Sequence, residues 1–411
     1  MKEKILRHLN NEYTEPVRDP LWQNIFLSPG FKKLTSLAPF QHLAGIKQLG
    51  PSYHVYPGAT HTRLSHSLGV FHISKRIISR LVSHPDCIKL SEEGVKSFLC
   101  ASLLHDLGHF PYAHSLKELP LKDHEVLTGE LILSDPLKSC IENEVGASSW
   151  KTAAIVNLEM PDENNKEVIF FRNILSGVLD PDKLDYLNRD AFFCGVPYGI
   201  QDTDFAISKI VPAPEGIGIN MQGITAVENI LFSKYLMYKT VYWHKTVRIA
   251  TAMIKKAVIT GLLDGSIKDE DLYGLDDNRF FSRYNKEFHP VMELIEMVNQ
   301  RKLYKCVYET PFLPESDIHK ALTNLEYRLD FEKQKTKELG CSDLIIDIPE
   351  PISFEINLPV LSGGKYTSYI DAESVFSGPV VNGFTRSLRK IRLYVPEDQT
   401  GLMKLDGDIL N

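Results

Sequence analysis

The amino-acid sequence predicts a mainly α-helical protein with a smaller C-terminal part that mixes helices and strands. Apolar residues recur at helical spacing after Thr60, and a second apolar run, residues 95–108, is long enough for another helix. Beyond about residue 268 this pattern gives way to short alternating stretches that are typical of strands. We therefore expect three parts, namely residues 1–57, residues 58–267 and residues 268–411.

The first part mixes short apolar pieces with proline and glycine, which favours loops and a β-hairpin packed on the core. The core begins with a helix whose expected N-cap is Thr60. Its apolar stripe contains Val70, Ile73, Ile77 and Leu81. The next helix is expected to end at Gly108, because glycine is common just after helix C-termini. Two further helices are expected over residues 174–193, interrupted by Asp180-Pro181, and over residues 225–263.

The C-terminal appendage is expected to combine one helix with several short strands. Residues 315–340 have a helical composition, whereas residues 342–358 alternate apolar and polar positions and contain prolines that interrupt a strand. The run KIRLYVPE, from Lys390, predicts a final strand. No internal repeat and no low-complexity tract is present in the sequence.

Composition and charge exclude several classes of protein. The 411 residues are 43% apolar and 24% charged, as in ordinary globular proteins, and the net charge of −7 disfavours broad binding to nucleic acid or anionic membrane. No apolar run approaches the roughly 20 residues of a membrane span. The six cysteines are scattered without a CxxC pair, which predicts a reducing, cytoplasmic location.

The chemistry is concentrated in LLHDLGHFPYAHS, residues 103–115, where His105 and Asp106 follow an apolar helix. A lone His-Asp pair has little meaning, but His66 lies on the preceding helix and Asp182 on a later one. Two imidazoles and two carboxylates from three core helices are typical of a catalytic metal site that keeps coordination positions open. The alternative is a set of polar core residues that satisfy one another.

Three fragments resemble the HD-domain deoxynucleoside triphosphate triphosphohydrolases: PGATHTRLSHSLGV, LLHDLGHFPYAHS and LDPDKLDYLNRDAFFCGV. The resemblance covers roughly residues 15–260, and the C-terminal third has no motif that matches. It implies an HD-domain helical bundle with a mononuclear or dinuclear metal site. The implied ligands are the same four residues, and the divalent ion could be Mn, Mg, Fe, Zn or Ni.

The resemblance also assigns acid and base roles to a histidine cluster, His109, His114 and His124, with Glu125 beside it. His124 and His114 are the expected pair at the reacting phosphate, since histidine can shuttle protons near neutral pH. The related enzymes carry an acidic residue shortly after the counterpart of His114. Here Lys117 stands at that place, and Glu118 is the nearest substitute.

The substrate-binding residues are likewise implied by the resemblance, since a triphosphate needs cations that tolerate desolvation. Arg63, Lys183 and Tyr186 would bind the phosphates, and Lys234 would reach one of them. Asp190, Gln48 and Leu49 would contact the sugar, Tyr242 would pack beneath the deoxyribose, and His244 would lie near the base. Lys234, Tyr238 and Tyr242 also fit an ordinary aromatic core seam.

The expected reaction is hydrolysis of a deoxynucleoside triphosphate to deoxynucleoside and inorganic triphosphate. Two alternatives remain: another HD-type phosphohydrolase, acting on nucleoside monophosphates or phosphodiesters, and a nucleotide-binding or single-strand nucleic-acid-binding module with little catalysis. The resemblance implies a homo-oligomer, either a dimer or a tetramer, and a possible nucleotide effector. His42 and Ala44 depart from the arginines that form the effector site in the vertebrate relatives.

Overall fold

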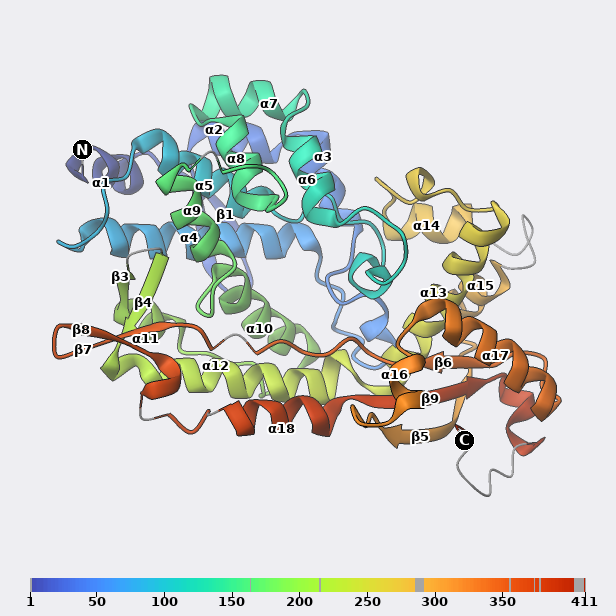
Figure 1. Ribbon diagram of the computed structural model, residues 1–411. Coiled ribbons are helices and arrows are strands. Elements are labelled where there is room, and N and C mark those ends of the chain that lie inside the picture. Colours follow the sequence, from blue (N-terminus) through green and yellow to red (C-terminus); the bar gives the residue numbers. More distant parts are fainter. Residues whose placement is uncertain are drawn as a thin grey trace.

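The structure is a computed structural model that describes residues 2–162, 164–213, 216–284, 292–354, 356–372, 374–376, 378–402 and 410. Within these residues the protein is mainly helical, with small sheets beside the helices (Figure 1). The predicted fold class is therefore confirmed, since an α-helical core is joined by a C-terminal part that mixes helices and strands.

The helices of the first half of the chain are α1 (Lys2–Asn11), α2 (Pro29–Thr35), α3 (Ala38–Gln41), α4 (Arg63–Ser83), α5 (Glu92–Leu104), α6 (His124–Ile132), α7 (Leu137–Cys140), α8 (Ser149–Val156), α9 (Lys166–Leu175) and α10 (Pro181–Cys194). The later helices are α11 (Thr203–Lys209), α12 (Ile224–Met237), α13 (Lys245–Asp264), α14 (Asp277–Arg283), α15 (Glu293–Asn299), α16 (Asp317–Ala321), α17 (Leu325–Leu339) and α18 (Gly378–Leu388). The strands are β1 (Glu15–Asp19), β2 (Gln23–Leu27), β3 (Ile210–Ala213), β4 (Gly216–Asn220), β5 (Lys305–Pro311), β6 (Ile345–Asp347), β7 (Pro359–Ser362), β8 (Lys365–Ser368) and β9 (Lys390–Val395).

Helix α4 forms the centre of the core and packs against α5 and α10 (Figure 1). Its predicted apolar stripe, Val70, Ile73, Ile77 and Leu81, is fully buried. Close packing with α10 depends on Gly69, because a Cβ atom there would lie 1.9 Å from Oδ1 of Asp185. Three helices that carry predicted metal ligands are thus held together by apolar packing.

Several helix boundaries differ from the prediction. Helix α4 is preceded by Thr62 rather than Thr60, and α5 ends at Leu104 rather than Gly108. Gly108 instead allows α6 to approach, since a Cβ atom there would lie 2.2 Å from the His124 carbonyl oxygen. The expected helix over residues 174–193 is two helices, because the Asp180 carboxylate caps α10 and ends the continuity.

The expected long helix over residues 225–263 is also divided. A π-helical turn, Tyr238–Tyr242, follows α12, and α13 starts after His244. The helical stretch expected over residues 315–340 is likewise two helices, α16 and α17. In the N-terminal segment the predicted hairpin is present as β1 and β2, whereas α1 was not predicted.

The C-terminal strands belong to two different sheets. Strands β7 and β8 extend the pair β3 and β4 in the order β3-β4-β7-β8, with β4 and β7 parallel (Figure 1). The predicted strand from Lys390 is β9, which lies between β5 and β6. Residues 342–358 were expected to alternate as strands, but among the described residues of this range only β6 forms. Ile352, Phe354 and Val360 instead join the same buried cluster as α4, so the boundary near residue 268 stays a prediction.

Two further observations concern the cysteines and the search for a helix that could span a membrane. All six cysteines are free, and Cys87, Cys100, Cys140 and Cys194 are buried, which agrees with their use as small apolar residues. Among the residues that the structure describes, no helix is both long enough and apolar enough to cross a membrane.

Candidate functional site

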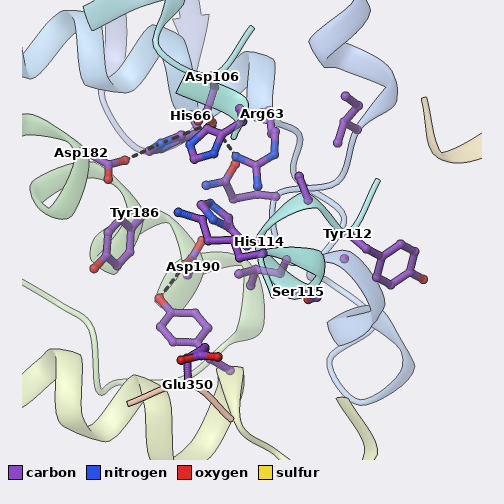
Figure 2. Close-up of a pocket in the computed structure, with 18 of the residues that line it drawn as sticks. Arg63, His66, Asp106, Tyr112, His114, Ser115, Asp182, Tyr186, Asp190 and Glu350 are labelled. Atoms are coloured by element: carbon purple, nitrogen blue, oxygen red, sulfur yellow. Dashed lines mark hydrogen bonds and ion pairs between the residues drawn. The ribbon is translucent and has the colours of Figure 1, made fainter. Parts of the chain in front are cut away.

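Three potential metal ligands converge between α4, α5 and α10. His66 lies one turn inside α4, His105 directly follows α5, and Asp182 lies in the first turn of α10. The distance from Asp182 Oδ1 is 2.8 Å to His66 Nε2 and 3.7 Å to His105 Nε2. One ligand atom from each of the three lies within 4.8 Å of the others. Figure 2 shows the contact between His66 and Asp182. The convergence of these three predicted ligands is therefore present in the structure.

In His66 and His105, a contact of Nδ1 decides which ring nitrogen faces the place where the three candidate ligands meet. Nδ1 of His66 lies 2.8 Å from Oδ2 of Asp185, and Nδ1 of His105 lies 3.0 Å from the Ser102 carbonyl oxygen. Each acceptor fixes a proton on Nδ1 and leaves the lone pair of Nε2 for a ligand. Nε2 of His105 is buried and has no hydrogen-bond partner in the structure. Two lone pairs and a carboxylate oxygen at one point fit a divalent cation.

The pKa of the His66 imidazole also favours a cation at this place. Burial alone would lower the pKa of His66, but hydrogen bonds to Asp182 and Asp185 outweigh it and raise the pKa to about 10. Without a cation the imidazole would therefore hold a second proton between these carboxylates. A divalent cation supplies the same compensation with a larger charge.

The fourth predicted ligand, Asp106, is buried beside this point and is engaged with Arg63. Its Oδ2 accepts a hydrogen bond from Arg63 Nη1 at 2.7 Å and lies 4.0 Å from His66 Nε2. Its Oδ1 lies 3.4 Å from His105 Nε2. Burial would raise the pKa of Asp106, but the charge of Arg63 and nearby histidines holds it well below its usual range. Arg63 thus forms a buried ion pair at the edge of the site.

The predicted histidine cluster is also assembled. The ring centroid of His109 lies 4.0 Å from that of His124 and 4.6 Å from that of His114. His124 is 8% exposed, and His114 is open to solvent. Burial, followed by the charge of Arg63, holds the pKa of His109 well below its usual range, so this ring is neutral. Ligand atoms of the three histidines also lie within 4.8 Å of one another.

The acidic partner of this cluster is not the one that the sequence suggested. Glu118 forms ion pairs with Lys255 and Arg328 on the other side of its turn. Asp123 instead lies 2.9 Å from Nδ1 of His124 and 3.6 Å from the ammonium of Lys117. The signal in the sequence that points to this pairing is an N-cap aspartate of α6 directly before a histidine of the cluster.

These groups open into a cavity of about 690 Å³, a size typical of small-molecule sites. Most of the predicted site residues line it: His66, His105, Asp106, Asp182, Arg63, His114, His124, Glu125, Gln48, Leu49, Tyr186, Asp190, Lys234 and Tyr242. His109 lies behind this surface and is fully buried. Glu350, which was not predicted, contributes a carboxylate from the segment between β6 and β7 (Figure 2).

The proposed sugar-binding residues form a connected group away from the metal ligands. Asp190 is buried (Figure 2). Its two oxygens lie 2.8 Å from His61 Nε2 and 2.6 Å from the Tyr242 hydroxyl. The rings of Tyr186 and Tyr242 meet edge to face at 6.4 Å. Oε1 of Gln48 is buried without a hydrogen-bond partner in the structure, so an incoming donor would satisfy it.

Two predicted substrate ligands, Lys183 and His244, do not line the cavity, and their roles stay predictions. The ammonium of Lys183 donates to Asp180 at 2.6 Å and to the Gly177 carbonyl at 2.9 Å, and Lys183 does not line the cavity. His244 does not line it either, because its Nδ1 accepts the Thr246 amide and caps α13. In both cases a local hydrogen bond near a helix N-terminus fixes the side chain.

Lys234 lines the cavity, and its ammonium donates to the Ser353 carbonyl at 2.6 Å. It also lies 5.5 Å from the centroid of the Phe354 ring. The segment between β6 and β7 runs along α12 at this point (Figure 1). A phosphate at Lys234 would therefore have to compete with a backbone carbonyl of the C-terminal part.

Comparisons with known proteins agree with this site. The chain matches the HD domain family over residues 63–164 and the HD associated region over residues 202–403. It is 32% identical over 356 residues to an uncharacterized protein of Methanocaldococcus jannaschii, with 84% of this chain and 72% of that protein covered. It is 26% identical to the deoxynucleoside triphosphate triphosphohydrolase SAMHD1 of Homo sapiens, with 72% of this chain and 55% of that protein covered.

Solved structures of similar fold were also found. A crystal structure of a hypothetical protein from Aquifex aeolicus has a TM-score of 0.73 and 28% identity, with 94% of this chain and 97% of that chain covered. A phosphohydrolase from Bacteroides thetaiotaomicron has a TM-score of 0.71 and 23% identity, with 93% and 100% covered. The second likeness concerns the fold alone. Together these similarities extend from the region of the metal ligands through the C-terminal part.

Proposed function

The chain belongs to the family of HD-domain proteins that carry an HD-associated region, and on this basis we propose that it is a metal-dependent phosphohydrolase. We further propose that it hydrolyses deoxynucleoside triphosphates to deoxynucleosides and inorganic triphosphate. The observation that carries the proposal is the meeting of His66, His105 and Asp182 at the end of a cavity large enough for a nucleotide. The likeness to SAMHD1 supports the choice of substrate.

His66, His105, Asp106 and Asp182 would hold the divalent ion. When bound, such an ion lowers the pKa of coordinated water and offsets negative charge on the reacting phosphate. Asp106 would also hold the buried guanidinium of Arg63 beside the other proposed metal ligands, through the hydrogen bond between them. This arrangement places one fixed positive charge next to the position proposed for the α-phosphate, where charge increases during attack.

The rest of the substrate would lie along the cavity away from the metal. Arg63, Tyr186 and Lys234 would bind phosphate oxygens, and Gln48, Leu49 and Asp190 would contact the sugar. Tyr242 would pack against the deoxyribose, since its hydroxyl is already held by Asp190 and its ring borders the cavity. Lys183 would also bind a phosphate oxygen, and His244 would lie near the base, once each gives up its present hydrogen bond.

Hydrolysis requires attack of water on the α-phosphorus and a proton for the leaving 5′-oxygen of the sugar. His114 and His124 line the cavity and are the proposed proton-transfer residues, with Glu125 beside them. His109 is buried behind these two rings and contacts both of them, so it would support them. Positioned acid and base groups of this kind contribute factors of about 10² to 10⁴ to a rate.

Product analysis with one deoxynucleoside triphosphate and Mn²⁺ tests the proposal. We expect deoxynucleoside and intact inorganic triphosphate in equal amounts. Release of orthophosphate or pyrophosphate would instead identify another HD-type phosphohydrolase, and tight binding without turnover would identify a nucleotide-binding module. Each of these two results would overturn the proposed reaction.

We also propose that turnover needs no nucleotide effector. In the region of His42 and Ala44, Cβ of Asp276 lies 2.7 Å from the position of a Cβ atom on Gly45. Asp277 forms an ion pair with Lys47 at 3.0 Å. These carboxylates engage Lys47 and Arg279 in ion pairs, which leaves less positive charge here for an anionic effector. A hyperbolic rate curve with one substrate would agree with this, and activation by a second nucleotide would contradict it.

The last proposal concerns self-association of the chain. We propose a homo-oligomer, a dimer or a tetramer, on the strength of the family resemblance. Light scattering after size-exclusion chromatography measures the mass in solution directly. A mass of 46.6 kDa at all concentrations would contradict this proposal.

A further inference from the structure

The three histidines of the cluster differ in how firmly they are held. The ring of His124 stacks on the buried ring of His109, with centroids 4.0 Å apart and an interplanar angle of 25°. His114 meets His124 edge to face at 5.1 Å and is open to solvent. His124 is therefore fixed by a neighbour on one face, whereas His114 has more freedom to move.

The histidines also differ in their acidic neighbours. Oδ1 of Asp123 lies 2.9 Å from Nδ1 of His124 and accepts the backbone amide of Glu125 at 3.0 Å, so the carboxylate is itself held at the N-terminus of α6. Among the described residues, no carboxylate lies within ion-pair distance of His114. The neighbour of His109 is Asp106, which is already bound to Arg63.

We propose that Asp123 is the positioning residue that makes His124 the proton donor to the leaving oxygen. This inference rests on the proposed hydrolysis and names which histidine of the cluster serves it. With Nδ1 facing Asp123, Nε2 is the nitrogen that His124 offers to the cavity. Lys117, 3.6 Å from Oδ2 of Asp123, holds the carboxylate from the other side.

The chemical step balances without any further reactant. The oxygen of water forms a bond to the α-phosphorus, and the bond from this phosphorus to the 5′-oxygen breaks. The 5′-oxygen takes the electron pair of that bond and receives the proton from Nε2 of His124. The attacking water loses its proton to solvent, and the imidazole regains one from solvent before the next turnover. The products are the deoxynucleoside and inorganic triphosphate.

The substitution Asp123→Asn separates this role from helix capping. Asparagine is as good an N-cap as aspartate, so α6 keeps its cap while the charge beside His124 is lost. We expect kcat for a deoxynucleoside triphosphate to fall at least about 10-fold, with KM changed less than about 3-fold and metal content unchanged. The matched control is Asp202→Asn at the N-cap of α11, which should leave all three quantities unchanged.

A double-mutant cycle then tests whether Asp123 acts through His124. In a His124→Gln background, Asp123→Asn should cause no further loss of kcat, because its target is gone. Unchanged kcat in the single Asp123→Asn variant would overturn the inference. So would an equal loss in both backgrounds, which would indicate a general structural effect. If the wild-type protein releases no triphosphate, the proposed function fails instead, and the two failures are thereby distinguished.

Discussion

Asp185 accepts the Nδ1 hydrogen of His66 at 2.8 Å, and both side chains are almost completely shielded from solvent. The same carboxylate accepts from Arg189 at 2.8 Å and from the indole of Trp22, which lies at the turn of the N-terminal hairpin. Arg189 in turn reaches Asp19 at 2.8 Å. The hairpin therefore helps to orient His66, a proposed metal ligand that lies more than forty residues further along the chain.

The first prediction concerns Asp185→Asn. The variant keeps the shape of the side chain but weakens the acceptor of the His66 hydrogen bond, so we expect divalent-metal affinity to fall about 10- to 100-fold. The protein should still fold, because Arg189 keeps Asp19 as a partner. Competition with a chelator of known affinity measures the change, and the exposed Asp204→Asn serves as the control. Equal affinity in both variants would contradict the role of Asp185.

The second prediction separates two ligands by their effect on stability. His105→Ala and Asp106→Ala should both abolish bound metal and hydrolysis. In metal-free protein, Asp106→Ala should also cost about 3–5 kcal/mol of unfolding free energy, because it leaves the buried Arg63 without its partner. His105→Ala should cost about 1 kcal/mol, the value of its hydrogen bond to Ser102. Urea denaturation in the presence of EDTA checks this, and similar losses would contradict it.

The third prediction concerns Lys234→Met. The methionine keeps most of the apolar packing but removes the charge proposed to bind a phosphate, so KM should rise about 10-fold, the effect of roughly 1.4 kcal/mol. Metal content should be unchanged, since Lys234 lies on α12 and the metal ligands on other helices. Lys239→Met, further along the chain, is the control. An unchanged KM would mean that the carbonyl of Ser353 is the permanent partner of Lys234.

The fourth prediction is a pH dependence of stability from His72. This ring lies against Trp22 with centroids 5.9 Å apart, and burial, followed by the charges of Arg76 and Lys75, lowers its pKa to about 4. The unfolded chain, with a pKa near 6.5, binds the proton more readily. The contribution of neutral His72 to the free energy of unfolding is therefore complete above pH 6.5, and it is lost as the pH falls toward 4.

The variant His72→Phe keeps the ring but cannot take up a proton. Between pH 7 and pH 4 the wild type should lose about 1–3 kcal/mol of unfolding free energy relative to this variant. Urea denaturation of both proteins at pH 7, 5.5 and 4.5 measures the difference and removes the titrations that they share. A difference that stays constant across this range would refute the assignment.

The sequence by itself determined the helical core and the convergence of three candidate metal ligands, His66, His105 and Asp182. The apolar stripe of α4 and the His-Asp pair after α5 are local patterns, and a helix fixes which of its residues face inward. Since His66, His105 and Asp182 each border an apolar helix face, packing of those faces was enough to bring them together. The β-hairpin and the final strand were predictable for the same reason, because their alternation is also local.

Only the tertiary structure decided which partners these residues take. In the sequence Asp185 looked like an ordinary helix carboxylate and Asp123 like a helix N-cap. Their contacts with His66 and His124 depend on rotamers and on the approach of neighbouring elements. The ammonium of Lys183 donates to the carboxylate of Asp180, three residues away, and does not line the cavity. The spacing of residues in the sequence cannot decide between these two positions. The segment carrying Glu350 reaches the cavity because β7 pairs with β4, a contact that no local pattern specifies.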